Sequence, residues 1–304
     1  MRNAFAETLY DCATADPRIF IVVADISPAG SMAKFQSQYP ERFINVGVAE
    51  QSMIGICGGL ALKGCRPFAY TIATFTLYRP FEMVRVDLAY QNLPVTVVGM
   101  GAGVIYSTLG GTHHTQEDIA IAGAIPNMQI LAPCDPLETI EATRHCATQN
   151  KGPVYLRLGK AGEPTFTKDA HDPFVFGKPR YIWKGDGVAV LTHGVIIKMA
   201  TEIATSLKEK GASVSLISCH TLKPLDHEAI GDILRRHRKV IVVEEHAPQG
   251  GLASQTKQIA WDIGAACDLR VFTLQDAFIH CYGSHDDLLA AHGLSRERIL
   301  SMVS

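Results

Sequence analysis

One carboxylate interrupts an apolar, glycine-rich stretch, NVGVAEQSMIGICGGLAL, which spans residues 45–62. This carboxylate is Glu50, and it stands near the start of a segment with helical spacing. First-turn amides stabilise such a charge by a few tenths to about 1 kcal/mol, which would explain the carboxylate but not its glycine-rich surroundings. A buried carboxylate can share a proton with a nitrogen base held against it, and small neighbours leave room for a ligand. We therefore treat Glu50 as the leading candidate for chemistry.

Two further stretches carry side chains that could serve a site beside Glu50. ATFTLYRPF, residues 73–81, supplies three aromatic rings, and GGTHHTQED, residues 110–118, supplies His113 and His114. Adjacent histidines point in different directions on a regular element, and no His-x-x-x-His pattern follows. The eight cysteines include no Cys-x-x-Cys pair and are interpreted as reduced core residues. We predict no metal site formed by this chain alone.

The elements that must position these residues alternate between two types. Short β-branched runs alternate with longer segments of helical period, as in parallel sheets covered by helices. The first series predicts strands at 19–24, 67–71, 95–99, 129–131 and 154–156, and helices near 3–15, 49–63, 79–91 and 135–148. A second series predicts strands at 188–192, 214–218, 240–243 and 270–274, and helices at 196–210, 225–236 and 252–264.

A change of composition separates the two series. GKAGEPTFTKDAHDPFVFGKPRYIWK, residues 159–184, contains three prolines and three glycines without a clear period, which is typical of a linker. We place a first domain at residues 1–160, the linker at 161–183 and a second domain at 184–304. The predicted fold class is α/β, with two three-layer α/β/α domains and mostly parallel sheets.

Composition excludes some classes of partner. The chain has 304 residues, 47% of them hydrophobic, and a formal net charge of −2. No block of like charges favours nucleic acid or an anionic membrane surface. The apolar runs are far too short to cross a bilayer, and the first residues lack the apolar core of a signal peptide. We expect a cytoplasmic protein.

Several stretches, taken in order, resemble a known family. DISP (25–28), FINVGVAEQ (43–51), ATFTLYRP (73–80) and GGTHHTQED (110–118) are similar to the pyrimidine-binding domain of transketolases. HTLKPLD (220–226) and VEEHAPQGGL (243–252) are similar to the C-terminal domain of that family. The resemblance covers almost the whole chain and implies a transferase that uses thiamine diphosphate and Mg²⁺.

The resemblance also implies roles for particular residues near the cofactor. Glu50 matches the catalytic glutamate that hydrogen-bonds the pyrimidine ring nitrogen and selects its proton-accepting tautomer. Phe75 and Tyr78 match the aromatic wall against the pyrimidine, which Phe81 would extend. Asp25 is also expected to contact the cofactor.

At the substrate end the match is weaker. His113 matches a histidine that faces substrate hydroxyls and is expected to be catalytic, with Arg2, Ser27 and Lys160 as further substrate contacts. The family's usual groups are replaced at four other positions, by Ala29, Gly101, Leu109 and Gly111. We therefore expect a substrate other than the standard pentose and hexose phosphates.

Half of the expected enzyme is missing from this chain. Transketolases hold Mg²⁺ and the diphosphate with Gly-Asp-Gly followed by Asn, but no Asn follows Asn150, so we interpret Gly185-Asp-Gly187 as a turn. The resemblance is to the C-terminal subunit of a split transketolase that transfers a two-carbon ketol unit from a ketose to an aldose. A separate N-terminal subunit would bind the Mg²⁺-diphosphate, in a heterotetramer built on a homodimer of this chain.

Two alternatives stay open at this point. The β subunit of a 2-oxo acid dehydrogenase E1, or a relative of deoxyxylulose phosphate synthase, shares this pair of domains. A non-catalytic scaffold or regulatory subunit is the alternative from another class. Retention of Glu50, Phe75 and His113 favours the catalytic hypothesis.

Overall fold

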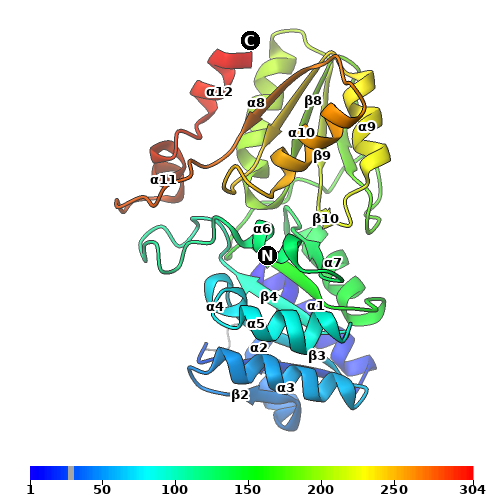
Figure 1. Cartoon of the computed structure of the whole chain (residues 1–304), viewed down its shortest axis with the longest axis vertical. Helices are drawn as coiled ribbons and strands as arrows, with labels where there is room; N and C mark the ends of the chain where they lie inside the picture. The colour runs from blue at the N-terminus through cyan, green and yellow to red at the C-terminus, as the bar shows by residue number, and fades with distance from the viewer. Residues whose placement is uncertain (27–30, 304) are drawn as a thin grey trace.

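The computed structural model describes residues 1–26 and 31–303. The chain forms two sheets, each covered by helices, and Figure 1 shows the two halves stacked along the long axis. The first sheet has seven strands in the order β10-β5-β6-β4-β3-β1-β2. They are β1 (Ile19–Val23), β2 (Phe43–Asn45), β3 (Arg66–Ile72), β4 (Thr96–Met100), β5 (Gln129–Leu131), β6 (Val154–Leu158) and β10 (Thr221–Lys223).

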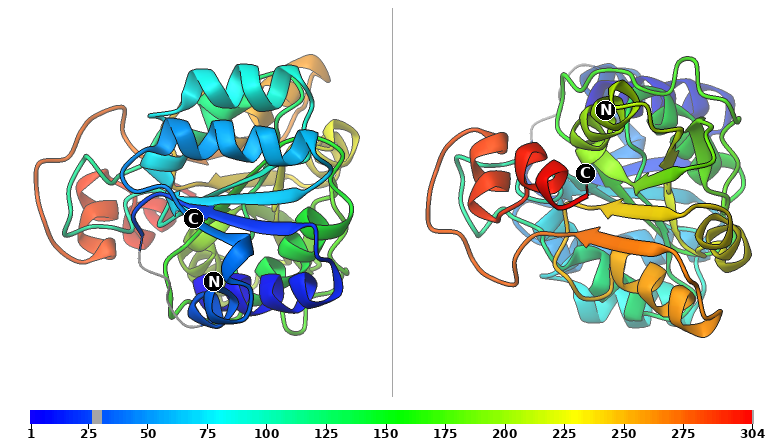
Figure 2. Two further views of the ribbon diagram at one scale, coloured as in Figure 1. Left: turned by 90° about the horizontal axis from the view of Figure 1, so that it is seen from below. Right: turned by 90° about the horizontal axis from the view of Figure 1, so that it is seen from above.

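Helices cover both faces of this sheet, as the left view of Figure 2 shows. One face carries α1 (Arg2–Ala15), α2 (Ser31–Gln38) and α7 (Pro136–Thr148), with the turn η1 (Pro40–Arg42) nearby. The other carries α3 (Glu50–Leu62), α4 (Ala73–Leu77), α5 (Phe81–Met83), the π-helical η2 (Val84–Tyr90) and α6 (Asp118–Ala124). Because both faces of the sheet are covered, its strands need apolar side chains at successive positions. In β1, Ile21 and Val23 point into one core and Val22 points into the other.

The second sheet has five strands in the order β12-β11-β8-β9-β7. They are β7 (Arg180–Trp183), β8 (Val188–Thr192), β9 (Val214–Ser218), β11 (Lys239–Val243) and β12 (Asp268–Phe272). One face of this sheet is covered by α8 (Ile197–Glu209), α11 (His285–Ala291) and α12 (Arg296–Val303). The turn η3 (Gly194–Ile196) directly precedes α8. Helices α9 (His227–Arg236) and α10 (Leu252–Asp262) pack on the other face, seen from above in Figure 2.

The two domains are joined by more than the linker. Strand β10 comes from the second half of the chain, yet it pairs antiparallel with β5 at the edge of the first sheet. One hydrophobic core contains side chains of both domains, including Ile130 and Leu191. The domains therefore share buried surface and a strand pairing.

The predicted fold class, two α/β/α domains with mostly parallel sheets, is confirmed. Several short elements were not expected from the sequence, including α2, β2, α6, β10, α11 and α12, and two of the expected elements differ in their bounds. The last four residues of the expected linker form β7, which pairs antiparallel with β9. The expected helix at 79–91 is present as α5 and η2, which run without a break over 81–90, but it begins only after Pro80 and its second part is π-helical. Proline lacks an amide hydrogen and restricts the residue before it, so α4, which ends at Leu77, does not continue into α5.

Three further observations bear on interpretations made from the sequence. Within residues 1–26 and 31–303, no helix is long and apolar enough to cross a membrane. All eight cysteines are free thiols, four of them buried, whereas Cys281 is exposed. Gly187 and Val188 donate backbone hydrogen bonds to the carbonyl of Ser213, so the triplet at 185–187 leads directly into β8.

Candidate active site

The parallel strands of the first sheet bring five of the candidate residues to one edge. Asp25 follows β1, Glu50 follows β2, Phe75 follows β3, His113 follows β4 and Lys160 follows β6. The carboxyl ends of parallel strands lie at the same edge, which is where open α/β sheets bind ligands. The topology therefore assembles one candidate site from distant parts of the sequence.

Glu50 is the first residue of α3, and only 3% of its surface is exposed. Its carboxylate does not stand alone. Nη1 of Arg79 donates to both Oε1 and Oε2 of Glu50, at 2.8 Å each. The same guanidinium lies over the ring of Phe75, with Cζ 4.9 Å from the ring centroid. Arg79 belongs to the ATFTLYRP stretch, but the sequence alone assigned it no role.

A groove of about 720 Å³ lies beside this contact. Its volume is within the range of small-molecule sites, about 300–1,000 Å³. The lining residues come from α4, the loop after β4, α6 and the second domain, namely Thr74, Phe75, Tyr78, Arg79, Gly111, Thr112, His114, Glu117, Ile121 and Phe278. Among the described residues, the buried hydroxyl of Thr74 has no hydrogen-bond partner. An aromatic groove with an unpartnered polar atom can accept a flat, partly polar ligand.

The expected aromatic wall is only partly in the groove. Phe75 and Tyr78 line it. The Tyr78 hydroxyl donates to Oε2 of Glu117 at 2.9 Å, and burial together with nearby acidic groups raises the pKa of Tyr78. Phe81, by contrast, packs against the hydrophobic core and does not line the groove.

His113 contacts the wall from the side. Its ring meets Phe75 edge-on at a centroid distance of 5.2 Å, and Tyr106 in the same way at 6.2 Å. Nδ1 lies 3.0 Å from the hydroxyl of Thr112. Burial lowers the pKa of His113, so the imidazole is neutral near pH 7 and can donate or accept a proton. The neighbouring His114 is buried, lines the groove and also has its pKa lowered by burial.

Arg2 and Lys160, both expected as substrate contacts, lie close to each other and to Tyr106. The amide of Arg2 donates to the carbonyl of Lys160 at 3.1 Å, and Nζ of Lys160 lies 5.4 Å from the ring centroid of Tyr106. Burial raises the pKa of Tyr106, and the charge of Arg2 opposes that shift. Tyr106 was not predicted as a site residue, because only the fold places it between His113 and the two cations.

One expected residue, Asp25, is not brought into this group, and another lies outside the described residues. Ser27 lies outside the described residues, as does Ala29. Asp25 is exposed, with φ of +45°, and its amide donates to the Asn45 side chain at 3.2 Å. None of the contacts described for residues 1–26 and 31–303 links the Asp25 carboxylate to the groove.

Gly101 marks a close approach between the backbone and the ring of Tyr106. Its φ is +68°, and a Cβ atom there would overlap the ring of Tyr106. We predict that Gly101→Ala lowers the free energy of unfolding by about 2 to 4 kcal/mol, because it combines backbone strain with overpacking. Gly47→Ala is the matched control, since φ is +69° there and no atom lies within 4 Å of the added Cβ. Urea unfolding of both variants checks this, and equal losses would show that contact with Tyr106 is unimportant.

The second domain holds the loop that carries His113. Oε1 of Glu245 accepts hydrogen bonds from the amide of Val104 at 2.6 Å and from Nε2 of His285 at 2.9 Å. A Cβ at Gly103 would overlap the Glu245 side chain, so the loop and the carboxylate are in close contact. The start of the loop is thus fixed by a carboxylate from outside its own domain.

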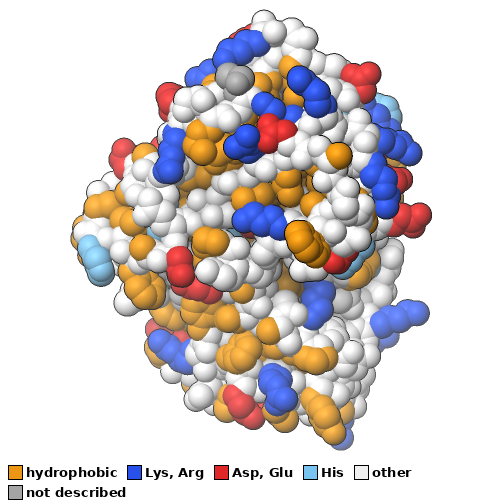
Figure 3. Space-filling view, turned by 45° about the horizontal axis from the view of Figure 1, so that its top comes forward, with side chains coloured by type: hydrophobic (Ala, Val, Ile, Leu, Met, Phe, Trp, Pro, Cys, Tyr) orange, Lys and Arg blue, Asp and Glu red, His pale blue; other side chains and the backbone are white. Residues whose placement is uncertain are grey.

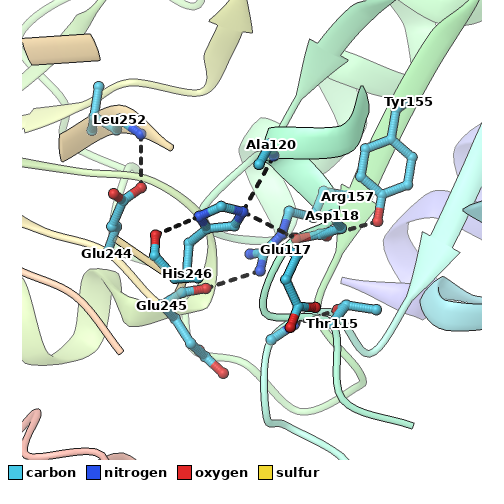
Figure 4. Close-up of polar contacts among 12 residues, drawn as sticks. Thr115, Glu117, Asp118, Ala120, Tyr155, Arg157, Glu244, Glu245, His246 and Leu252 are labelled. Carbon is cyan, nitrogen blue, oxygen red and sulfur yellow. Dashed lines mark hydrogen bonds and ion pairs between the residues drawn. The ribbon is translucent and has the colours of Figure 1, made fainter. Parts of the chain in front are cut away.

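A buried ion pair lies behind the same loop, as Figure 4 shows. Nε of Arg157 donates to Oδ2 of Asp118 at 2.8 Å, and Nη2 donates to the carbonyl of Glu245 at 3.0 Å. The hydroxyl of Tyr155 donates to the same Oδ2 at 2.8 Å. Nε2 of His246 accepts from the amide of Ala120 at 3.3 Å. Polar contacts therefore link β6, α6 and the segment after β11.

The Glu245–His285 pair predicts a pH-dependent contribution to stability. Burial alone would lower the pKa of His285, but attraction to the Glu245 carboxylate and the hydrogen bond that His285 donates to it raise that pKa overall. The stabilisation is therefore present below about pH 6.5, the unfolded value, and is lost as pH rises through the raised pKa. We expect His285→Gln to lower the free energy of unfolding by about 1 to 2 kcal/mol more at pH 6 than at pH 9. Urea unfolding at both pH values measures this, with His227→Gln, a change at an exposed histidine, as the control. Equal losses for His285→Gln at pH 6 and pH 9 would contradict the prediction.

Comparison with known proteins gives the following matches. The transketolase pyrimidine binding domain matches residues 1–162, and the transketolase C-terminal domain matches residues 177–299. The chain is 31% identical to one subunit of the apulose-4-phosphate transketolase of Phocaeicola vulgatus, over 98% of this chain and 94% of that protein. It is 33% identical to a putative transketolase C-terminal section of Methanocaldococcus jannaschii, over 100% of this chain and 95% of that protein. The solved structure of a split-gene transketolase, described as an inactive β4 tetramer, superposes with a TM-score of 0.86 at 29% identity, over 99% and 95% of the two chains.

Proposed function

The chain belongs to the transketolase family, as a C-terminal subunit of the split type, and we propose that it forms the pyrimidine-binding half of a two-chain active site. In this proposal the assembled enzyme transfers a two-carbon ketol unit from a ketose to an aldose. Thiamine diphosphate supplies the electron sink that such carbon–carbon bond cleavage requires.

One observation carries the proposal. A buried carboxylate, Glu50, and an aromatic ring that lines a groove, Phe75, are both in contact with a single planar side chain, that of Arg79. A planar nitrogen heterocycle needs the same two partners, an acid at its edge and an aromatic ring at its face. The residues present therefore fit the aminopyrimidine of the cofactor.

Roles for the chain's own residues follow from this geometry. Glu50 would hydrogen-bond the pyrimidine ring nitrogen and exchange a proton with it. Phe75 and Tyr78 would stack against the ring, which is worth about 0.5 to 1.5 kcal/mol beyond area burial. Asp25 and Phe81 are still proposed to contact the cofactor, although neither residue lines the groove.

At the substrate end, His113 would move a proton to or from a sugar hydroxyl, since its imidazole is neutral near pH 7. Arg2 and Lys160 would bind an anionic group, and Ser27 would add a contact. The ring of Tyr106 fills the space above Gly101. We therefore propose a substrate other than the standard sugar phosphates, and equal turnover of ordinary pentose and hexose phosphates would contradict that part.

The outer face of α3 supports a partner. Four of its exposed residues are small or apolar, namely Gly55, Ile56, Gly59 and Leu62. Figure 3 shows hydrophobic side chains gathered over the lower half of the face drawn there, which the first domain occupies. Such patches are typical of surfaces that another chain covers. We propose a homodimer of this chain, flanked by two N-terminal subunits with Gly-Asp-Gly and Asn that bind Mg²⁺ and the diphosphate.

Reconstitution tests the proposal. The chain would be co-expressed with a candidate N-terminal subunit, and cofactor binding by calorimetry and ketol transfer would be measured for each chain and for the complex. We expect cofactor binding and ketol transfer only in the complex. Decarboxylation of pyruvate without ketol transfer would favour the dehydrogenase or synthase alternative. Full activity of the partner alone would favour a scaffold.

A further inference from the structure

We propose that Arg79 closes the cofactor site of the free chain by occupying the place of the aminopyrimidine, and that it must leave Glu50 when the cofactor binds. This inference rests on the proposed function, because it concerns the regulation of the same site. It begins from the two contacts that the Arg79 guanidinium makes.

The first contact pairs both oxygens of the acid with a cation. A single nitrogen of Arg79, Nη1, lies 2.8 Å from both oxygens of Glu50. A charge-assisted hydrogen bond of this kind is about twice as strong as a neutral one. The carboxylate that would receive the pyrimidine nitrogen is therefore already paired.

The second contact occupies the aromatic face. Cζ of Arg79 lies 4.9 Å from the centroid of Phe75, within the distance of a cation–π interaction. A guanidinium is planar, delocalised and rich in N–H donors, so it stacks on rings and bonds carboxylates at its edge. An aminopyrimidine that hydrogen-bonds Glu50 and stacks on Phe75 would use the same two surfaces in the same way.

Burial shows which of the two partners can move. The Glu50 side chain is 4% exposed, whereas the Arg79 side chain is 48% exposed. A ligand atom cannot reach Glu50 while its surface is covered, so a neighbour has to shift. Arg79 is half in solvent, lines the groove and has a long flexible stem, so it is the partner that would rotate outward.

Two consequences follow for the enzyme. The free chain keeps Glu50 neutralised, so the buried acid is not left as an unpaired charge before the complex forms. Cofactor binding must break the Arg79 contact, which lowers the apparent affinity by the fraction of time that the site is open. Removing the guanidinium should therefore strengthen cofactor binding.

The test is calorimetric titration of the assembled complex with thiamine diphosphate and Mg²⁺. Arg79→Met keeps the aliphatic stem and removes the charge and the N–H donors. We expect its dissociation constant to be about three to ten times lower than that of the unmodified complex, with Arg79→Lys in between. Arg85→Met is the matched control, because Arg85 is exposed on η2 and its replacement removes the same charge from the same region. Its dissociation constant should change less than about twofold.

Equal or weaker binding by Arg79→Met, relative to Arg85→Met, would overturn the proposal, since Arg79 would then be a bystander or a cofactor ligand. If Arg79→Met fails to fold, Arg79→Lys alone must still bind more tightly than the unmodified complex. Absence of cofactor binding by every complex, unmodified included, would instead reject the proposed function, and the closure with it. The two failures are therefore distinguishable.

Discussion

Replacing Glu50 by Gln is expected to reduce ketol transfer by the assembled complex by about 10²- to 10⁴-fold, the usual worth of a positioned proton-transfer group. Glutamine has nearly the same shape and can still accept a hydrogen bond from Arg79. It cannot exchange the proton that the pyrimidine nitrogen requires. Transfer rates at saturating cofactor, measured for both complexes, check this prediction.

The control for this substitution is Glu82→Gln. Glu82 is an exposed residue of α5 and lies near the site in the sequence, yet it does not line the groove. We expect its activity to stay within about twofold of the unmodified complex, as for surface changes in general. Undiminished transfer by the Glu50→Gln complex would show that the catalytic role assigned to Glu50 is wrong.

Most of the fold could be predicted because strands buried on both faces leave a clear signal. The run IFIVV of β1 and the run VAVLT of β8 are apolar at almost every position, as parallel sheets require. The elements that were missed are short and depend on distant partners. Strand β10 has three residues, and it pairs with β5, a strand from the other half of the chain, so no local pattern announces it.

The candidate site divides in the same way. Glu50 stands out in the sequence because a charge among glycines and apolar residues is an unusual local pattern, whereas Phe75 was assigned through the resemblance of its stretch to the transketolase family. Arg79 and Tyr106 do not stand out, because their importance depends on which side chains the fold places beside them. The sequence also suggested a free acid in an apolar setting, and the structure pairs that acid with a guanidinium.

The contacts between the domains give the second domain a role in shaping the site. Glu245 holds the amide of Val104 at the start of the loop that carries His113. Arg157 bonds the backbone of Glu245 and the side chain of Asp118 at the start of α6. A change in this network should therefore affect both the stability of the chain and the position of the loop.

Asp118→Ala is expected to lower the free energy of unfolding by about 3 to 5 kcal/mol, the usual cost of leaving one member of a buried ion pair alone. The Asp118 side chain is fully buried and that of Arg157 is 3% exposed, so solvent cannot replace the lost partner. The hydroxyl of Tyr155 would lose its acceptor as well. Urea unfolding of the free chain measures the effect.

Glu141→Ala, which breaks the exposed pair with Arg144, is the control and should cost less than about 1 kcal/mol. Replacing both members of the buried pair, Asp118→Leu with Arg157→Met, should recover much of the loss, because no uncompensated charge would be left inside. A double variant as unstable as Asp118→Ala would mean that the shape of the network, rather than its charge balance, holds the two domains together. A loss below about 1 kcal/mol for Asp118→Ala would mean that Arg157 finds another partner, and the ion pair would then have no special part in fixing the loop.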